Sequence, residues 1–397
     1  MDAPAATTPA SPAAPPKHPP PRQRKKAPPW IAWPQGIAAR GAMSLPLVIG
    51  LSSALRTARA VGRTIPRLPK IGPKYMGRAV KNLTDAFPDW PQEKIRQYAV
   101  HSLEHLCQLG VEVTYAPRLI TQEGFARHLI FTEIAPGLRE LLGSRPVILI
   151  TGHVGNWELI GYAISMLGFP MHAVYRPFDL QMLDEWMVQT RERRGLTLVS
   201  KFGAVRALPP VLRAGYPAGL VADQSGGDRG LFTPFFGRLT STYKSIGILA
   251  MQTGATLVCG MARRLRHGEA TPPGPWMQTP SMGRQFRSTP DSPSLRYSVE
   301  LTDIFGPESW QGQPDPLYYL TARYRKAIET MVRRAPEQYF WMHRIWRSRP
   351  AHERLGKPFP PMLKEKLSSL PWMTSADVEA VIERSRLDAL EVANAKK

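Results

Sequence analysis

Residues 146–158 contain the most informative pattern in the chain and read Pro146-Val147-Ile148-Leu149-Ile150-Thr151-Gly152-His153-Val154-Gly155-Asn156-Trp157-Glu158. The run 147–151 is apolar and short, which is typical of a buried strand. Gly152 and Gly155 supply the backbone freedom that a sharp turn after this strand requires. An apolar stripe with helical spacing follows the turn and consists of Leu159, Tyr162, Ala163, Met166 and Leu167. The pattern therefore predicts a strand, a turn and a helix.

Two side chains in this unit can perform acid–base chemistry. His153 lies in the predicted turn, and Glu158 lies in the first turn of the predicted helix. Five residues along a regular helix turn through about 500°, so the two side chains can meet only if the helix begins between them. A carboxylate beside a histidine fixes the ring tautomer and stabilises the imidazolium that forms when the ring takes a proton. Such a pair needs no serine or cysteine nucleophile.

The rest of the chain predicts an α/β fold. Residues 77–140 are expected to be mainly helical, with a long helix that starts after Pro91 and presents Ile95, Ala99, Leu103 and Leu106 on one face. Short apolar runs then alternate with helical patterns over 141–350, at 146–151, 172–175, 196–200, 218–223, 256–262 and 297–304. This alternation favours a mainly parallel, twisted sheet flanked by helices on both faces.

Four other segments stand apart from this catalytic α/β region. The proline- and alanine-rich residues 1–29 end in basic side chains and predict a disordered arm. Residues 263–295 are rich in proline, serine and glycine and predict an insertion between two late strands. Residues 351–397 form a C-terminal extension, in which 374–394 has the spacing of an amphipathic helix with Val378, Val381, Ile382 and Leu390 on one side.

The fourth segment, residues 30–76, contains an uncharged stretch at 41–55 followed by many basic residues. The stretch is too short to span a bilayer comfortably, and its charges follow rather than precede it, unlike those of a secretory signal. It has two interpretations of equal weight: a helix lying in the membrane interface, or the first helix of the core.

The composition restricts the partners. With 397 residues, 43% hydrophobic and 9% aromatic, the chain is globular and long enough for an enzyme with additions. Its net charge of +21 attracts nucleic acids, anionic membrane surfaces or acidic proteins. No RNA-binding strand pattern, zinc-finger spacing or basic zipper accompanies the charge, so nucleic acid is disfavoured. Cys107 and Cys259 lie in apolar stretches, which favours reduced, buried thiols and a cytoplasmic setting.

Motifs for cofactors are absent from the sequence. There is no His-Glu-x-x-His motif, and the loop from Asp223 to Gly230 lacks the spacing of a calcium-binding loop. Neither a phosphate-binding loop nor a dinucleotide fingerprint follows a predicted strand. We therefore expect a metal-free site and no cofactor beyond the substrates.

Several blocks in the correct order resemble the bacterial lipid A biosynthesis acyltransferases, the lauroyl and myristoyl transferases of the lysophospholipid acyltransferase-like superfamily. The block 151–159 resembles the family's signature with its His-x4-Glu motif. The later blocks are 174–177, Asp223-Gln224 with Phe235-Phe236-Gly237, the segment 249–258, and 336–344, while Asn82-Leu83 and Phe87-Pro88 match the helical N-terminal part. The resemblance covers roughly residues 40–350, and ordered blocks together are specific where each alone is not.

The resemblance implies a glycerol-3-phosphate acyltransferase-like fold and an acyltransferase at the cytoplasmic face of the bacterial inner membrane, peripheral or weakly anchored. His153 is then the general base and Glu158 its orienting partner. The acyl donor is a thioester, of acyl carrier protein in preference to coenzyme A because an acidic carrier suits a basic chain. The acceptor is a glycolipid such as a lipid A precursor, and the partners include an anionic membrane surface but no nucleic acid.

The resemblance also implies substrate-binding residues, namely Asn156, Arg176, Asp223, Gln224, Phe235, Phe236, Gly237, Glu337, His343 and Arg344. Arg176 is suited to a head-group phosphate because its guanidinium binds phosphate oxygens in pairs; the alternative is an ion pair with Asp223. The block 235–237 is expected to form the wall and turn of an acyl pocket, with core packing as the alternative. His343 and Arg344 are possible head-group contacts, although the closing block 336–344 equally fits a cap on the last strand.

Three classes of function remain open at this stage. The first is direct acyl transfer to a glycolipid, or to a phospholipid or other glycolipid from acyl-coenzyme A. The second is a lipid or thioester hydrolase in which the same pair activates water. The third is a non-catalytic, membrane-bound basic protein with a degenerate site.

Overall fold

The computed structural model describes residues 29–121, 124–192, 195–266, 269 and 295–394. The basic arm predicted for 1–29, apart from Pro29, and most of the insertion predicted for 263–295 lie outside the described residues. Within that insertion, Arg263 and Arg264 belong to a strand and not to a loop.

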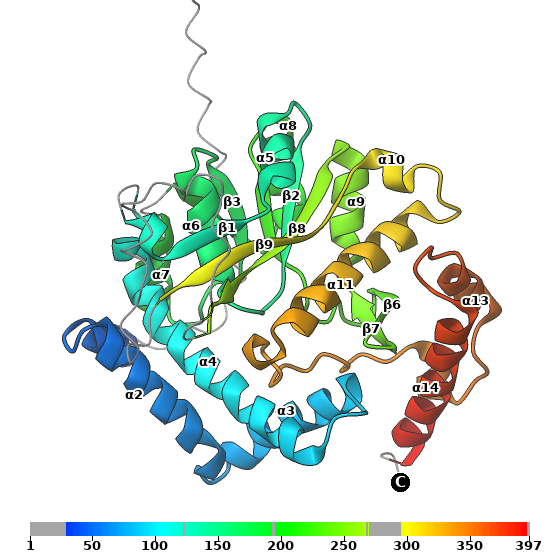
Figure 1. The fold of residues 1–397 in the computed structure, drawn as a ribbon, viewed down its shortest axis with the longest axis horizontal. Coiled ribbons are helices and arrows are strands. Elements are labelled where there is room, and N and C mark those ends of the chain that lie inside the picture. Colours follow the sequence, from blue (N-terminus) through cyan, green and yellow to red (C-terminus); the bar gives the residue numbers. More distant parts are fainter. Residues whose placement is uncertain (1–28, 122–123, 193–194, 267–268, 270–294, 395–397) are drawn as a thin grey trace, which may run out of the picture.

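The core of the described chain is one 7-stranded sheet with the order β1-β9-β8-β2-β5-β3-β4 (Figure 1). Its strands are β1 (Leu129–Thr132), β2 (Val147–Thr151), β3 (Met171–Tyr175), β4 (Leu196–Ser200), β5 (Ala218–Val221), β8 (Thr256–Arg264) and β9 (Tyr297–Phe305). Neighbouring strands are parallel except for β8 and β9, which are antiparallel. The predicted α/β class with a mainly parallel sheet is confirmed, and each predicted strand is present.

One further prediction of local structure was wrong, whereas the turn predicted at 235–237 is present. Residues 129–132 were predicted to belong to the helical part but form the edge strand β1. The sequence does not reveal this strand, because a run of four residues is too short to show a period and the strand forms by pairing with β9. The block 235–237 is the turn of an antiparallel hairpin formed by β6 (Leu231–Phe235) and β7 (Arg238–Thr242). Phe236 has φ of 53° and Gly237 has φ of 66°, the left-handed pair that a two-residue hairpin turn requires.

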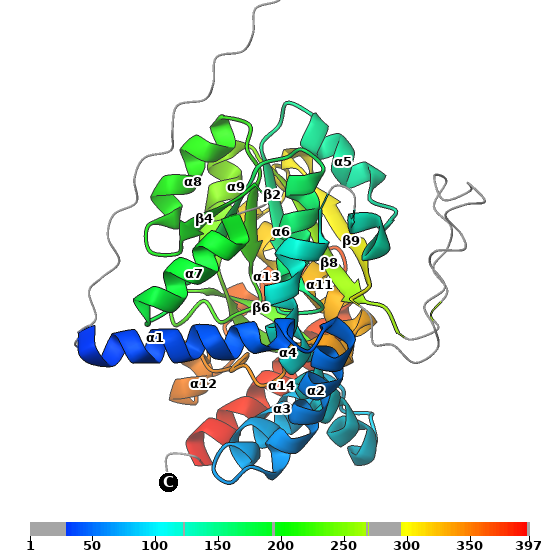
Figure 2. The same cartoon turned by 90° about the vertical axis from the view of Figure 1, so that its left-hand side faces the viewer.

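Helices cover both faces of the sheet (Figures 1 and 2). On one face, α8 (Ala204–Arg213), α9 (Lys244–Thr253) and α11 (Pro316–Arg334) contribute to the largest hydrophobic cluster. On the other face lie α5 (Ala135–Leu142), α6 (Trp157–Met166) and α7 (Gln181–Glu192). Because helices cover both faces of the sheet, both faces of a central strand are buried, and β2 has no exposed residue.

The N-terminal helices pack beside the sheet. They are α1 (Pro29–Ser44), α2 (Leu51–Thr64), α3 (Gly72–Ala86) and α4 (Gln92–Leu119). Ala54, Leu55 and Ala58 of α2 are buried, and a Cβ on Gly62 would lie 2.5 Å from Cα of Glu104, so α2 is packed tightly on α4. The segment 41–55 therefore contributes to the core through its end, while Leu45 and Val48 are 62% and 80% exposed. No helix in the described part of the chain is long and apolar enough to cross a membrane.

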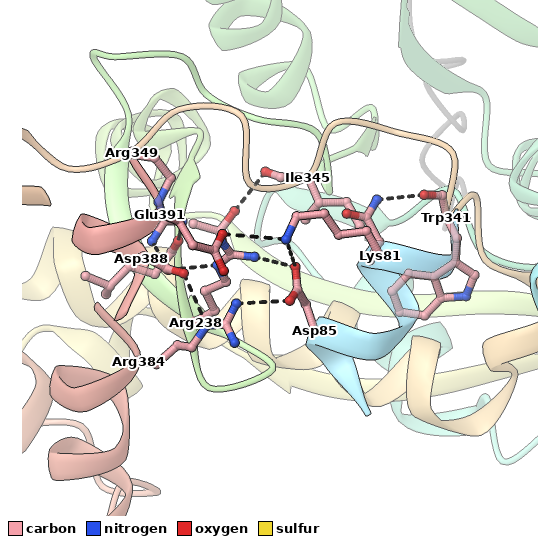
Figure 3. Close-up of polar contacts among 12 residues, drawn as sticks. Lys81, Asp85, Arg238, Trp341, Ile345, Arg349, Arg384, Asp388 and Glu391 are labelled. Carbon is pink, nitrogen blue, oxygen red and sulfur yellow. Dashed lines mark hydrogen bonds and ion pairs between the residues drawn. The ribbon is translucent and has the colours of Figure 1, made fainter. Parts of the chain in front are cut away.

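The C-terminal extension folds onto the same body. It contains α12 (Ala351–Leu355), α13 (Pro361–Ser368) and α14 (Ser375–Asn394), so the predicted terminal helix is confirmed. Val378 and Val381 are buried as expected, but Leu390 is 51% exposed. A buried network of ion pairs joins α14 to α3 and β7 through Arg238, which contacts Asp85 at 2.5 Å and Asp388 at 2.8 Å (Figure 3).

Candidate active site

The turn between β2 and α6 is anchored from two sides. The backbone N–H of Asn156 donates to Ala262 O of β8 (2.8 Å), and Phe340 N–H donates to His153 O (3.0 Å). Gly155 has φ of 59°, and a Cβ there would lie 2.0 Å from Ala262 O. Only glycine fits this close approach, so the turn holds His153 in one place at the C-terminal end of a parallel strand.

The carboxylate partner of His153 is Asp223, which follows β5. Nδ1 of His153 lies 2.6 Å from Oδ1 of Asp223, and the side chain of Asp223 is 2% exposed against 18% for His153. Because a carboxylate only accepts, Nδ1 donates, and Nε2 is left with a lone pair. The amide nitrogen of Gln224 lies 3.3 Å from Nε2 and donates to it. The ring is thus in the tautomer that a general base needs.

The charge on Asp223 is maintained by its surroundings. Burial alone raises the pKa of this carboxyl, but the interaction with His153 and the charge of the Arg325 guanidinium hold the pKa well below its usual range. Arg325 is fully buried, donates to Asp223 O at 2.5 Å and lies over the ring of Phe235 at 3.9 Å. Asp223 is therefore an ionised, fixed acceptor.

Glu158 does not have the place expected of it. Its side chain forms an ion pair with Arg191 of α7 at 2.6 Å, and the side chains of Glu158 and Arg191 are 16% and 12% exposed. The helix α6 begins at Trp157, which directs Glu158 toward α7, whereas the end of β5 brings Asp223 next to the ring. The predicted contact between His153 and Glu158 is replaced by a His153–Asp223 pair and a separate Glu158–Arg191 pair.

A buried polar cluster supports the turn from below. Glu112 of α4, with no exposed surface, accepts from Asn156 Nδ2 (2.9 Å) and lies 2.6 Å from Arg264. Asn156 also caps α6, because its Oδ1 accepts from Leu159 N–H at 3.3 Å. His105 Nε2 contacts Gly155 O at 3.0 Å. These contacts give Asn156 a structural role beneath the site.

His105 is neutral in this cluster. Burial, together with the charge of Arg264, lowers its pKa to about 3. Arg264 Nε donates toward Nδ1 at 3.4 Å, so the proton is on Nε2 and donates to Gly155 O.

A cleft of about 560 Å³ opens at His153. Of the predicted site residues, those that line it are His153, Glu158, Arg176, Gln224 and His343. The His343 ring stacks on that of His153 with centroids 6.2 Å apart, and Trp157 meets the same ring edge-on at 4.8 Å. Burial lowers the pKa of His343, so it faces the cleft as a neutral ring.

Cationic side chains lie at the mouth of the cleft. Arg176 and Lys201 are exposed and line it, together with the apolar Phe178 and Val205, which are 43% and 59% exposed. Burial and the charge of Arg176 lower the pKa of Lys201. The alternative ion pair between Arg176 and Asp223 was wrong, because Asp223 is buried against His153.

Other predicted site residues lie away from the cleft. Phe235 and Phe236 are buried in the main core, where the two rings meet edge-on at 4.8 Å, so core packing describes them better than a pocket wall. Glu337 pairs with Arg266 at 3.1 Å. Arg344 is exposed and outside the cleft lining, as is Gly237 in the hairpin turn.

A second cavity, of about 90 Å³, lies between the sheet and helices α5 and α6 and is called the apolar cavity below. Its walls are mainly apolar side chains of β2, β3, β5, β8 and β9, such as Leu149, Val258 and Leu301. Trp157, which touches His153, lines both spaces.

No group of three or more His, Cys, Asp or Glu side chains in the described ranges is arranged to hold a metal ion. Cys259 is buried as predicted, whereas Cys107 is only partly buried, and burial raises the pKa of each thiol.

The comparison with known proteins decides the family. The family model for bacterial lipid A biosynthesis acyltransferases matches residues 28–273. The chain belongs to this family. It is 28% identical over 219 residues to the lipid A biosynthesis palmitoleoyltransferase of Escherichia coli (strain K12), a match that covers 54% of this chain and 60% of that relative.

Two longer matches lie within the same group of acyltransferases. The lipid A biosynthesis lauroyltransferase of Escherichia coli (strain K12) is 24% identical over 296 residues, covering 71% of this chain and 84% of the relative. A lipid A biosynthesis acyltransferase of Haemophilus influenzae is 21% identical over 287 residues, covering 71% and 79%. The resemblance drawn from the ordered sequence blocks is confirmed.

Sequence reasoning missed the partners of His153 and Glu158. Asp223, predicted to contact substrate, lies 70 residues from His153, and no local pattern joins the two. Arg191 lies 33 residues from Glu158, and no local pattern joins this pair. A charged residue directly after an apolar strand, as Asp223 is, was the available signal.

Proposed function

We propose that this member of the lipid A acyltransferase family transfers a fatty acyl chain from a thioester to a hydroxyl group of a glycolipid such as a lipid A precursor. The observation that carries the proposal is the His153–Asp223 pair at a cleft. The unprotonated Nε2 of His153 accepts from the Gln224 amide, and His153 lines a cleft with apolar walls. Its fold is proposed to be glycerol-3-phosphate acyltransferase-like, as the family resemblance implies.

The proposed reaction uses His153 as the general base. Nε2 takes the proton of the acceptor hydroxyl while the hydroxyl oxygen attacks the thioester carbonyl carbon. The carbon–sulfur bond of the tetrahedral intermediate then breaks, and the leaving thiolate takes the proton from the imidazolium. Asp223 holds Nδ1 and stabilises the imidazolium, which is the role we had expected of Glu158. No acyl-enzyme is formed.

Other cleft residues are assigned to binding. Gln224, whose amide already reaches Nε2, donates to the acceptor oxygen at the same point. The Glu158–Arg191 pair forms a polar wall beside it. Arg176 and Lys201 at the mouth are suited to an anionic head group, and the exposed Phe178 beside them to an acyl chain.

Donor and location are proposed from charge and surface. Acyl carrier protein is the preferred donor, because an acidic protein is attracted to a chain of net charge +21. We place the protein peripherally on the cytoplasmic face of the inner membrane, since Trp33, Leu45 and Val48 are exposed and the basic residues of α2 follow them in the chain.

The test is transfer of radiolabelled acyl groups from acyl carrier protein, and separately from coenzyme A, into a lipid extract, with free fatty acid measured in parallel. His153→Ala is expected to lower transfer by roughly 10²- to 10⁴-fold, the usual contribution of a general base. Asp223→Asn should lose most of the same factor, because an amide can hold the wrong tautomer.

The matched control is Glu337→Gln, which alters a carboxylate outside the cleft and should keep full transfer. Label found only as free fatty acid, at the same rate with or without acceptor, would indicate the hydrolase. Unchanged transfer in His153→Ala would overturn the mechanism.

A further inference from the structure

The cleft and the apolar cavity share part of their lining. Seven residues line both spaces: Trp157 and Gly161 of α6, Met171, Ala173 and Val174 of β3, and Leu220 and Val221 of β5. Strands β3 and β5 are neighbours in the sheet. A chain that enters the cleft at His153 meets the apolar cavity along this shared wall.

Met171 of β3 packs between α6 and β5 in this wall. A Cβ on Gly219 of β5 would lie 2.9 Å from Cε and 3.1 Å from Sδ of Met171, and a Cβ on Gly161 of α6 would lie 3.1 Å from the same Cε. The thioether end of Met171 is thus held between two glycines, one on the sheet and one on the helix above it. At 4% exposure, it closes the space that these glycines leave open.

We propose that Met171 sets the acyl-chain length that this protein accepts, by ending the path of the chain between the cleft and the apolar cavity. This inference rests on the proposed acyl transfer. Methionine is flexible and adapts to an apolar chain, but its volume still blocks further methylenes. The cavity beyond it, lined by Leu149, Val258 and Leu301, is apolar and stays outside the reach of the chain in the native protein.

The proposal predicts a change of specificity in one direction. Met171→Ala joins the two spaces, so chains longer by two carbons become substrates. One methylene in an apolar pocket changes discrimination by about 10- to 200-fold, so the ratio of kcat/KM for the longer chain over the native chain should rise by at least about tenfold. Met171→Val removes less volume and should move the ratio in the same direction by a smaller factor.

Two variants test the path itself. Val258→Leu fills part of the apolar cavity from β8, and Val258 does not line the cleft. Alone it should leave the chain-length preference unchanged, and combined with Met171→Ala it should cancel most of the gain. Met187→Ala is the matched control, because this methionine of α7 is 3% exposed and lines neither space. Met187→Ala removes a buried methionine side chain and should leave the chain-length preference unchanged.

The experiment measures transfer from acyl carrier proteins loaded with a series of saturated chains that differ by two carbons, for the native protein and these variants. A shift to longer chains in Met171→Ala or in Met171→Val, reversed by Val258→Leu, supports the proposal. A native preference retained by both Met171 variants, with transfer still measurable, overturns it and leaves the acyltransferase intact. If the native protein transfers no chain of the series, the proposed function itself fails.

Discussion

The substitution Asp388→Ala tests whether the C-terminal extension is part of the folding unit. Asp388 is 1% exposed and accepts from Arg238 Nε at 2.8 Å and from Arg349 Nη2 at 2.5 Å, with Arg384 at 3.2 Å (Figure 3). The network pairs three arginines with the carboxylates of Asp85, Glu353 and Asp388. Removal of one carboxylate therefore leaves one positive charge uncompensated in a buried place.

The expected loss of stability is substantial. Breaking a buried ion pair by removing one partner costs about 3–5 kcal/mol. In this variant Arg238 keeps its ion pair with Asp85, and Arg349 keeps its ion pair with Glu353, so the loss of stability should be near the lower end of that range. The better helix propensity of alanine offsets at most about 0.7 kcal/mol of the loss. We expect a net loss of about 3 kcal/mol.

The control lies on the same helix. Glu391 is 54% exposed and only approaches Arg238 at 3.9 Å and Lys81 at 3.6 Å, so Glu391→Ala should cost at most about 1 kcal/mol. Urea unfolding followed by tryptophan fluorescence measures both, since Arg238 lies 5.2 Å from the ring of Trp346. If the two variants agree within about 0.5 kcal/mol, a scatter typical of surface substitutions, the network does not hold the extension as argued.

Two further predictions concern the cluster beneath the catalytic turn. Glu112→Gln leaves the buried Arg264 without its carboxylate and should lower the free energy of unfolding by about 3–5 kcal/mol. The control Glu308→Gln alters an exposed pair and should lower it by less than about 1 kcal/mol. Equal thermal unfolding midpoints for the two variants would show that the cluster is unimportant for stability. His105 has a pKa of about 3 in the folded protein and about 6.5 in the unfolded chain, so the unfolded chain takes up the proton first as the pH is lowered. The free energy of unfolding therefore falls between these two pKa values, by about 1.4 kcal/mol per pH unit. His105→Gln should remove that part of the slope between about pH 6 and pH 4, and an unchanged slope in unfolding titrations would contradict the assignment.

The general fold was predictable because its signals are local. A buried strand such as β2 is apolar throughout, a helix such as α4 repeats Ile95, Ala99 and Leu103 on one face, and a turn such as that at Gly155 needs a particular residue. Each property follows from the period of the backbone or from the space around one Cα atom. The short edge strand β1 escaped because its pairing with β9 is not encoded in its own four residues.

The candidate active site also has a part that the sequence predicts and a part that only the tertiary structure shows. The sequence by itself determined that His153 follows a buried strand at a glycine turn, and that the chain carries the ordered blocks of the acyltransferase family. Only the tertiary structure decided that Asp223, and not Glu158, lies against the imidazole, and that Met171 lies between two cavities. Contacts of this kind join strands and helices that are far apart in the chain, so they depend on the order of strands in the sheet and on the direction of each helix. The spacing of residues along the sequence specifies neither the order of the strands nor the directions of the helices.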